Sequence, residues 1–210
     1  MRSASRLCRS RLAGVLAPLC SSALLLVGLT SCQPVLAAGA ATQVKSVEVQ
    51  PAGELLIRQQ ESQLLHRKVD LAGIRKLEGE RIVPETPPVA RVLIVHIWAV
   101  ECRPCIEEFP VLRPILDSLG GLTQVKAVMV SETTELPKLQ AFLRDNRALL
   151  PQLAQYQSSD ERLRASLQNH SQPATLLLDE RGIVRQAFLG SIRHRRSELA
   201  DAVRRLIKSI

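Results

Sequence analysis

Two cysteines separated by two residues, Cys102-Arg103-Pro104-Cys105, place the strongest constraint on the fold of this chain. The pair follows the apolar run 92–100, which predicts a buried central strand, and precedes segment 106–112, which reads as a helix. A thiol at the N-terminus of a helix lies at the positive end of the helix dipole, which favours the thiolate. The order of strand, cysteine pair and helix therefore predicts thiol–disulfide exchange.

Two competing interpretations of the cysteine pair have less support. A structural zinc site needs four ligands, but only three cysteines lie beyond Cys20 and no two histidines have the spacing of zinc ligands. We therefore expect no metal site. An inert structural disulfide would close a loop too short to constrain much of the unfolded chain. The expected reactive group is the redox-active disulfide Cys102–Cys105, with no other cofactor.

The N-terminal segment has the layout of an export signal. Four arginines precede an apolar core at 13–29, and the tetrapeptide Leu29-Thr30-Ser31-Cys32 follows that core. The tetrapeptide resembles a bacterial lipobox, in which cleavage precedes the cysteine and lipid is attached to it. We therefore expect residues 1–31 to be a signal peptide and 32–43 to be a lipidated Cys32 followed by a linker. Two or more acyl chains on Cys32 would anchor the protein stably to a membrane.

Two alternatives for this segment stay open. The small residues 37–40 also suit ordinary signal cleavage, and the apolar core would also serve as an uncleaved anchor, although it is short for a membrane span. All three interpretations export the domain. Cys8 and Cys20 lie in the signal, so only Cys102 and Cys105 remain beyond the lipidated residue. In an oxidising compartment that pair must be used deliberately or kept reduced by a partner.

The chain beyond the signal has the size of one domain with a tether. The signal carries four arginines and no acidic residues, so it accounts for half of the net charge of +8. The modest remaining charge and an aromatic content of 2% argue against a nucleic-acid partner. Residues 44–90 are predicted to be an N-terminal extension with short strands, suggested by Val44, Val47, Val49, Leu55 and Ile57, by Leu64-Leu65 and by Val69-Asp70-Leu71.

Residues 91–210 alternate between strand and helix patterns. Strands are expected at 92–98, 125–130, 174–178 and 183–189, and helices after Cys105, at 136–143, near 161–169 and at 199–210. The turn Asp179-Glu180-Arg181-Gly182 is expected to join the last two strands as a hairpin.

This order resembles the thioredoxin fold, and more closely the membrane-tethered, extracytoplasmic TlpA/ResA-like group. Two blocks carry the resemblance: Ile97 to Pro110, which contains the cysteine pair, and Gln172 to Gly182, which begins with Gln172-Pro173. The resemblance covers about residues 91–210 and implies an α/β thioredoxin-like domain with a central mixed β-sheet flanked by helices. Members of the group have been associated with cytochrome c maturation and with keeping exported thiols reduced.

The resemblance also implies roles for individual residues. Cys102 would attack as the thiolate, Cys105 would resolve the mixed disulfide, and Glu108 would tune Cys105 or relay its proton. Pro173 would be a cis-proline facing the disulfide, although an ordinary trans-proline opening a strand would fit the same sequence. Glu108 also suits a carboxylate that favours a helix N-terminus. Substrate contacts are expected at Trp98, Arg103, Pro104, Gln172 and Pro173.

Several residues depart from the pattern of the group. Glu101 replaces the usual tryptophan and should oppose thiolate formation at Cys102, whereas Arg103 acts in the opposite direction. His96 occupies a position where thioredoxins carry a buried acid, and its neutral imidazole would serve as a proton relay to Cys105. A core histidine hydrogen-bonded to the backbone is the simpler alternative. Gln172 stands where a small or β-branched residue is commoner, which affects substrate choice.

These features together predict a lipid-anchored thiol–disulfide oxidoreductase that reduces disulfides of exported proteins. The expected partners are exported protein thiols and disulfides, a membrane electron donor and the membrane itself. The expected state is a monomer on the periplasmic side of a bacterium. Proline before the second cysteine favours a reductase, with an oxidase or isomerase as the alternative within the class. A Cu(I)-binding chaperone, since thiolates suit this soft ion, and a redox-inactive adaptor are the alternatives from other classes.

Overall fold

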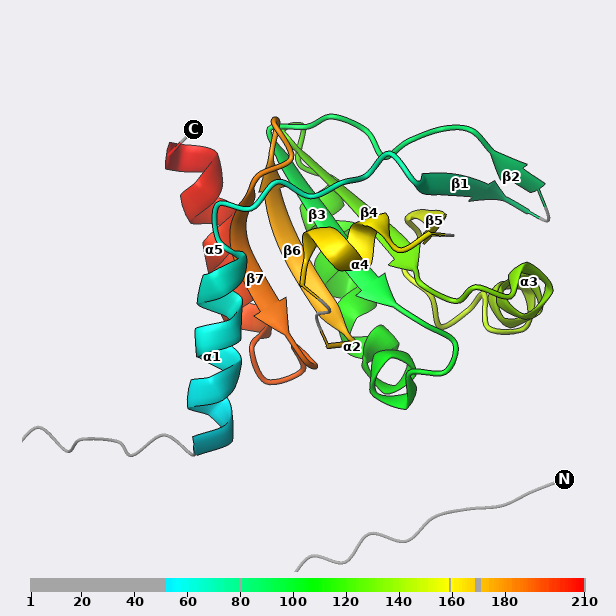
Figure 1. Cartoon of the computed structure of the whole chain (residues 1–210), viewed down its shortest axis with the longest axis horizontal. Helices are drawn as coiled ribbons and strands as arrows, with labels where there is room; N and C mark the ends of the chain where they lie inside the picture. The colour runs from blue at the N-terminus through cyan, green and yellow to red at the C-terminus, as the bar shows by residue number, and fades with distance from the viewer. Residues whose placement is uncertain (1–51, 80, 159, 169–170, 210) are drawn as a thin grey trace, which may run out of the picture. The chain divides into compact units, whose positions relative to one another are not determined.

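The computed structural model describes residues 52–79, 81–158, 160–168 and 171–209 (Figure 1). The expected signal peptide, Cys32 and the linker lie outside the described residues. Within the described residues, seven strands form one mixed sheet in the order β2-β1-β5-β4-β3-β6-β7. In chain order the elements are α1 (Ala52–Leu64), β1 (Ile74–Glu78), β2 (Arg81–Val83), β3 (Val92–Trp98), α2 (Arg103–Gly120), β4 (Val125–Ser131), α3 (Leu136–Asp145), β5 (Ala154–Ser158), α4 (Arg162–Ser166), β6 (Ala174–Asp179), β7 (Val184–Leu189) and α5 (Arg196–Ser209).

Strand β3 lies inside the sheet and is buried along its whole length. It runs parallel to β4, with Val92 opposite Val125, and antiparallel to β6, with His96 opposite Thr175. A strand that is covered on both faces needs apolar side chains in both directions, which explains its nearly unbroken apolar sequence. The expected central mixed sheet flanked by helices is confirmed, as are the strands predicted near 92–98, 125–130, 174–178 and 183–189.

Helices cover both faces of this sheet (Figure 1). One face carries a core in which Phe109 of α2 and Leu199 of α5 belong to the same buried cluster as Ile94 of β3. The core of the other face joins Leu64 of α1 to Val95 of β3. Because side chains alternate along a strand, β3 contributes to both cores, and the face under α2 receives Ile94, His96 and Trp98. The cysteine pair at the start of α2 therefore lies above that face.

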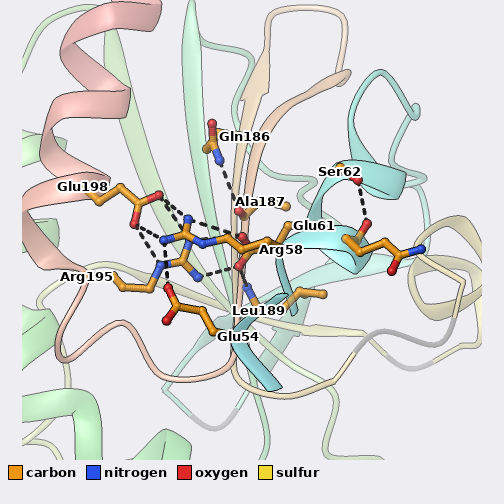
Figure 2. Close-up of polar contacts among 10 residues, drawn as sticks. Glu54, Arg58, Glu61, Ser62, Gln186, Ala187, Leu189, Arg195 and Glu198 are labelled. Atoms are coloured by element: carbon orange, nitrogen blue, oxygen red, sulfur yellow. Dashed lines mark hydrogen bonds and ion pairs between the residues drawn. The ribbon is translucent and has the colours of Figure 1, made fainter. Parts of the chain in front are cut away.

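A cluster of charged side chains joins helix α1 to the β7–α5 region (Figure 2). Glu61 is only 4% exposed, and its carboxylate accepts hydrogen bonds from the backbone N–H of Leu189 and from two nitrogens of Arg195. Arg58 reaches from α1 to Glu198 of α5, with N···O distances of 2.6 and 3.1 Å. Glu198 also accepts hydrogen bonds from Arg195. Each charge of the cluster is thus compensated by an opposite charge on another element.

Helix α1 corrects the prediction of a short strand at Leu55 and Ile57. The alternation of these residues predicts a strand, but both lie in α1, where they are 62% and 37% exposed. Charged residues at helical spacing decide the conformation instead, because Arg58 pairs with Glu54 four residues earlier and with Glu61 three residues later. The buried positions of α1 are Glu61 and Leu64, so its inward face is partly charged. A search for apolar residues at helical spacing therefore does not identify this helix.

The strand expected at Val44, Val47 and Val49 lies outside the described residues, and the rest of the described part of segment 44–90 differs in detail from the prediction. Leu64 ends α1, and segment 69–71 forms no strand, although the neighbouring Lys68 makes a single bridge to Ile183. The strands of this segment are β1 and β2, and β1 joins the main sheet by antiparallel pairing with β5. Strand β5 was not predicted, because its sequence Ala-Gln-Tyr-Gln-Ser has no apolar run. Among the described helices, none combines the length and apolarity needed to cross a membrane.

Candidate active site

The two cysteines form a disulfide at the N-terminus of helix α2, with a Cα–Cα distance of 5.3 Å. Cys102 is the N-cap residue and is half-buried, whereas Cys105 in the first turn is fully buried. The backbone N–H of Cys105 lies 3.2 Å from the sulfur of Cys102 and donates to it. An amide donor and the helix dipole both stabilise negative charge on that sulfur. The geometry therefore makes Cys102 the accessible thiol and Cys105 the one behind it.

The residues between the cysteines start the helix and lie in solvent. Pro104 occupies the first turn of α2, where the missing N–H of proline costs no helical hydrogen bond. The side chain of Arg103 is 88% exposed, and its Nε donates to Glu107 Oε1 at 2.7 Å. The charge of Arg103 is thus shared with a neighbouring carboxylate, which weakens its effect on the Cys102 thiolate.

Glu101 is also paired, which reduces the opposition to the thiolate that its sequence position predicts. Its carboxylate lies 2.7 Å from Nζ of Lys138 and accepts a hydrogen bond of 3.3 Å from the hydroxyl of Thr133. The hydrogen bond from Lys138 lowers the pKa of Glu101. The carboxylate is therefore ionised at neutral pH, but a cation from α3 compensates its charge.

Trp98 lies in the core beneath the cysteine pair, which corrects the expectation that it contacts substrate. Its side chain is completely buried. Its ring packs edge-to-face on Phe109 with centroids 5.2 Å apart and lies 5.5 Å from the ring of Phe142. These contacts fix the end of β3 against α2 and α3. Trp98 shapes the support of the site and offers no surface to a substrate.

The peptide bond between Gln172 and Pro173 is cis, as the resemblance implies. Because Ala174 pairs with Ile97, this bond lies beside the end of β3, from which the cysteine loop departs. Pro173 is buried, and its carbonyl oxygen accepts a hydrogen bond from the N–H of Gly190. Gln172 is half-buried at the edge of the site. The structure thus brings the cysteine pair and the cis-proline to the same end of the sheet.

One residue at this end of the sheet was missed by the sequence analysis. Glu132, which directly follows β4, accepts a hydrogen bond from the side-chain amide of Gln172, and Arg164 lies 3.1 Å from the same carboxylate oxygen. The N–H of Glu132 donates to the carbonyl of Trp98 at 2.8 Å. These three partners come from three segments distant from Glu132, so no local pattern around Glu132 could have indicated the contact.

His96 and Glu108 lie together under the first turns of α2. His96 Nε2 is 3.5 Å from Glu108 Oε1, and both side chains are buried. The other ring nitrogen, Nδ1, lies 3.0 Å from the hydroxyl of Thr175. The second carboxylate oxygen of Glu108 accepts from the Ser191 hydroxyl and from the N–H of Ile192 at 2.6 and 3.0 Å. The ring of His96 is therefore hydrogen-bonded to the side chain of Thr175 and lies against that of Glu108, whereas the simpler alternative expected a hydrogen bond to the backbone.

Burial changes the acidity of both members of this pair. It lowers the pKa of His96 to about 3, because the charged imidazolium cannot be solvated. Burial also raises the pKa of Glu108, although the hydrogen bonds from Ser191 and Ile192 and the charge of Arg193 act in the opposite direction. Glu108 lies three residues after Cys105, one helical turn further along the same buried face of α2. A buried carboxyl group with a raised pKa thus lies one helical turn after the inner cysteine.

Comparisons with known proteins bear on the fold. No protein-family model matches the chain, and no curated protein matches its sequence. StoA from Bacillus subtilis has 20% identity and a TM-score of 0.50, and the match covers 61% of this chain and 92% of StoA. A thiol:disulfide interchange protein from Bacteroides sp. has 14% identity and a TM-score of 0.52, covering 67% of this chain and 91% of its own. An uncharacterized thioredoxin-like protein from Porphyromonas gingivalis has 19% identity and a TM-score of 0.52, covering 69% and 94%.

The fold and the site together define the class of this domain. The mixed sheet, the cysteine pair at the start of α2 and the cis-proline before β6 make it a thioredoxin-like domain with a Cys-x-x-Cys disulfide. In the part of the chain that the structure describes, no group of three or more His, Cys, Asp or Glu side chains is placed to hold a metal ion.

Proposed function

We propose that this protein is a thiol–disulfide oxidoreductase that reduces disulfides of exported proteins from a membrane anchor outside the cytoplasm. One observation supports the activity above all others. The half-buried Cys102 caps a helix over the fully buried Cys105, at the end of the sheet where cis-Pro173 lies. This arrangement exposes one sulfur to a partner and protects the other, as a two-step exchange requires.

The exchange runs through a mixed disulfide. The Cys102 thiolate attacks one sulfur of the client disulfide, forms a new S–S bond and releases the first client thiolate. Cys105 then loses its proton, attacks the Cys102 sulfur and releases the second client thiolate. The client gains two electrons, and the enzyme is left with the Cys102–Cys105 disulfide seen in the structure. A dithiol donor at the membrane restores the reduced enzyme by the reverse sequence.

Other residues support these steps. Glu108 accepts the Cys105 proton, since it lies one turn along the same buried helix face and burial raises its pKa. The backbone at Gln172 and cis-Pro173 docks the client strand beside the disulfide, and the exposed Arg103 and Pro104 between the cysteines also contact the client. His96 takes part in the relay of this proton through its contact with Glu108.

The setting of this activity is proposed from the sequence. The lipobox-like segment ending at Cys32 supports a lipoprotein on the periplasmic side of a bacterial membrane. Client disulfides in cytochrome c maturation are the specific substrates that the resemblance to the TlpA/ResA-like group suggests. A membrane dithiol is the electron donor, and the protein works as a monomer without a further cofactor or nucleic acid.

The midpoint potential of the Cys102–Cys105 couple tests this proposal. It is measured by equilibrating the full chain, purified in detergent, with defined ratios of reduced and oxidised glutathione or dithiothreitol. We expect a value near or below about −230 mV, the range of reducing thioredoxin-like proteins, because proline precedes the second cysteine. A value above about −180 mV would instead make the protein an oxidant or isomerase. Without a reversible two-electron couple the enzymatic proposal fails.

A further inference from the structure

Two polar atoms face each other in the interior beneath the active site. His96 Nε2 and Glu108 Oε1 are 3.5 Å apart, and neither makes a well-formed hydrogen bond to another group. Each of the other polar atoms of the two side chains has a hydrogen-bond partner. Nδ1 contacts the hydroxyl of Thr175, and Oε2 accepts from Ser191 and Ile192. Nε2 and Oε1 are therefore the two polar atoms of this His96–Glu108 pair that have no hydrogen-bond partner.

Two lone pairs cannot face each other in a dry interior without a large cost, so one hydrogen must lie between Nε2 and Oε1. It belongs either to the carboxyl group or to the ring. If Glu108 is protonated, Oε1–H donates to Nε2, and the ring proton sits on Nδ1 and points to Thr175. If Glu108 is ionised, Nε2–H donates to Oε1, and the Thr175 hydroxyl donates to Nδ1. The two forms differ in the tautomer of His96, whereas the ring is neutral in both.

The surroundings favour a neutral ring throughout. Burial holds the pKa of His96 at about 3, and its ring lies against Phe109 with centroids 6.4 Å apart. Burial also raises the pKa of Glu108. The groups that face the Glu108 carboxyl are His96 from β3, Ser191 and Ile192 from the segment before α5, and the charge of Arg193 at longer range.

We propose that His96 is a positioning residue for Glu108 whose tautomer follows the redox state of the Cys102–Cys105 pair. In the oxidised protein Glu108 is protonated and donates to His96 Nε2. In the reduced protein Glu108 is ionised, and His96 Nε2–H donates to it. The inference rests on the proposed function, because it assumes that Glu108 and Cys105 exchange one proton during the reaction.

The proton balance of this exchange closes. A donor thiolate attacks the Cys102 sulfur, and Cys105 leaves with the electron pair of the broken S–S bond. The Cys105 thiolate then takes the proton of Glu108 and becomes a thiol. The ring of His96 gives its Nδ1 proton to solvent water and takes one proton from solvent water at Nε2, so that it stays neutral, while the Thr175 hydroxyl turns from acceptor to donor. The reverse occurs when Cys105 returns its proton to Glu108 and attacks a mixed disulfide.

Nitrogen-15 NMR of the histidine rings tests this inference, because it shows directly which ring nitrogen carries the proton. The full chain is labelled at histidine and measured in detergent, oxidised and then reduced with dithiothreitol, near pH 7. The His96 signal is assigned by its loss in His96→Asn, and the exposed ring of His194 is the internal control. We expect the proton on Nδ1 in the oxidised protein and on Nε2 in the reduced protein, with His194 unchanged.

A variant in which residue 108 cannot change its protonation state provides a second test. In Glu108→Gln the carbonyl oxygen can keep the donors Ser191 and Ile192, so the amide N–H of Gln points to His96 Nε2. We expect His96 in this variant to carry its proton on Nδ1 in both redox states. One tautomer in both states of the natural protein, or an imidazolium with two ring protons, would overturn the inference. A disulfide that dithiothreitol cannot reduce would overturn the proposed function and the redox-linked switch together, whereas a reducible disulfide with an unchanged His96 overturns the switch alone.

Discussion

The side-chain amide of Gln172 donates a hydrogen bond to the carboxylate of Glu132, a residue 40 positions earlier in the chain. Gln172 forms the cis bond to Pro173, and the N–H of Glu132 is bonded to the carbonyl of Trp98, the last residue of β3. The contact therefore ties the proposed docking loop, the segment at Gln172 and Pro173, to the end of the strand that precedes the cysteine pair. Arg164 shares the Glu132 carboxylate and balances its charge.

This link leads to a prediction about substrate binding. Glu132→Ala removes the acceptor that holds Gln172, so the docking loop becomes less ordered while the cysteine pair keeps its surroundings. A hydrogen bond to a charged group contributes about 1.5–3 kcal/mol, so the KM for a peptide disulfide should rise about tenfold or more. The rate with dithiothreitol alone, which needs no docking loop, should stay near that of the natural protein.

Glu180→Ala is the matched control for this measurement. Glu180 is an exposed acid in the β6–β7 turn, at the opposite end of β6 from Pro173. Its removal should leave both rates unchanged. An unaltered KM in Glu132→Ala, or an equal loss in Glu180→Ala, would contradict the role assigned to the contact between Glu132 and Gln172.

The exposures of the two cysteines predict different outcomes for their serine variants. Cys105→Ser leaves the accessible Cys102 to attack a client disulfide but removes the resolving thiol, so a mixed disulfide should accumulate. Cys102→Ser leaves only the fully buried Cys105, which a client cannot reach. Mass spectrometry under non-reducing conditions, after incubation with a disulfide peptide, should detect the adduct with Cys105→Ser and little with Cys102→Ser. Equal adducts with both variants would show that burial does not separate the two roles.

Features of the site that depend on neighbouring residues could be predicted from the sequence, whereas contacts between residues far apart in the chain could not. The cysteine pair, its strand and its helix are local, and apolar periodicity with helix-start chemistry predicted them. The cis bond before Pro173 was expected only through the resemblance, because the sequence alone also fits a trans bond. Glu132 and Ser191 reach the site through pairs 40 and 83 residues apart, which no local pattern can show.

The errors in the fold have a similar physical basis. The inward face of α1 is built partly from charge, since Glu61 is buried against Arg195, and a method based on apolar spacing misses such a face. Two of the three buried residues of strand β5, Gln157 and Ser158, are polar, and its pairing with β1 and β4 comes from the sheet and not from its own sequence. Its buried Gln157 donates to the carbonyl of Thr133, a bond that only the folded chain reveals.

The charge cluster around Glu61 predicts a large loss of stability when one partner is removed. Arg195→Met leaves the buried carboxylate of Glu61 without its bidentate partner. Breaking a buried pair in this way costs about 3–5 kcal/mol. The matched control is Arg204→Met, since Arg204 forms an exposed pair with Asp201 on the same helix, which contributes about 0–1 kcal/mol. Urea unfolding of both variants should separate them clearly, and similar midpoints would show that the cluster contributes little.

The pKa of His96 predicts how stability depends on pH. In the folded protein this pKa is about 3, against an ordinary value of 6.5 in the unfolded chain. Between these two values the unfolded state binds more protons at His96 than the folded state, so the stability falls as the pH falls from 6.5 towards 3. One proton corresponds to a slope of at most about 1.4 kcal/mol per pH unit. Urea unfolding of the oxidised protein at several pH values measures this slope.

The variants of the pair should move this slope in opposite directions. His96→Gln removes the titrating group, so stability should depend less on pH between 6.5 and 3. Glu108 acts against His96, because its raised pKa lets the folded protein hold a proton that the unfolded chain has already lost above its ordinary value of 4.5. Glu108→Gln should therefore stabilise the protein above pH 4.5 and steepen the net loss on acidification. His194→Gln, at an exposed position, should change neither slope. If His96→Gln kept the full pH dependence, the neutral buried imidazole would no longer explain it.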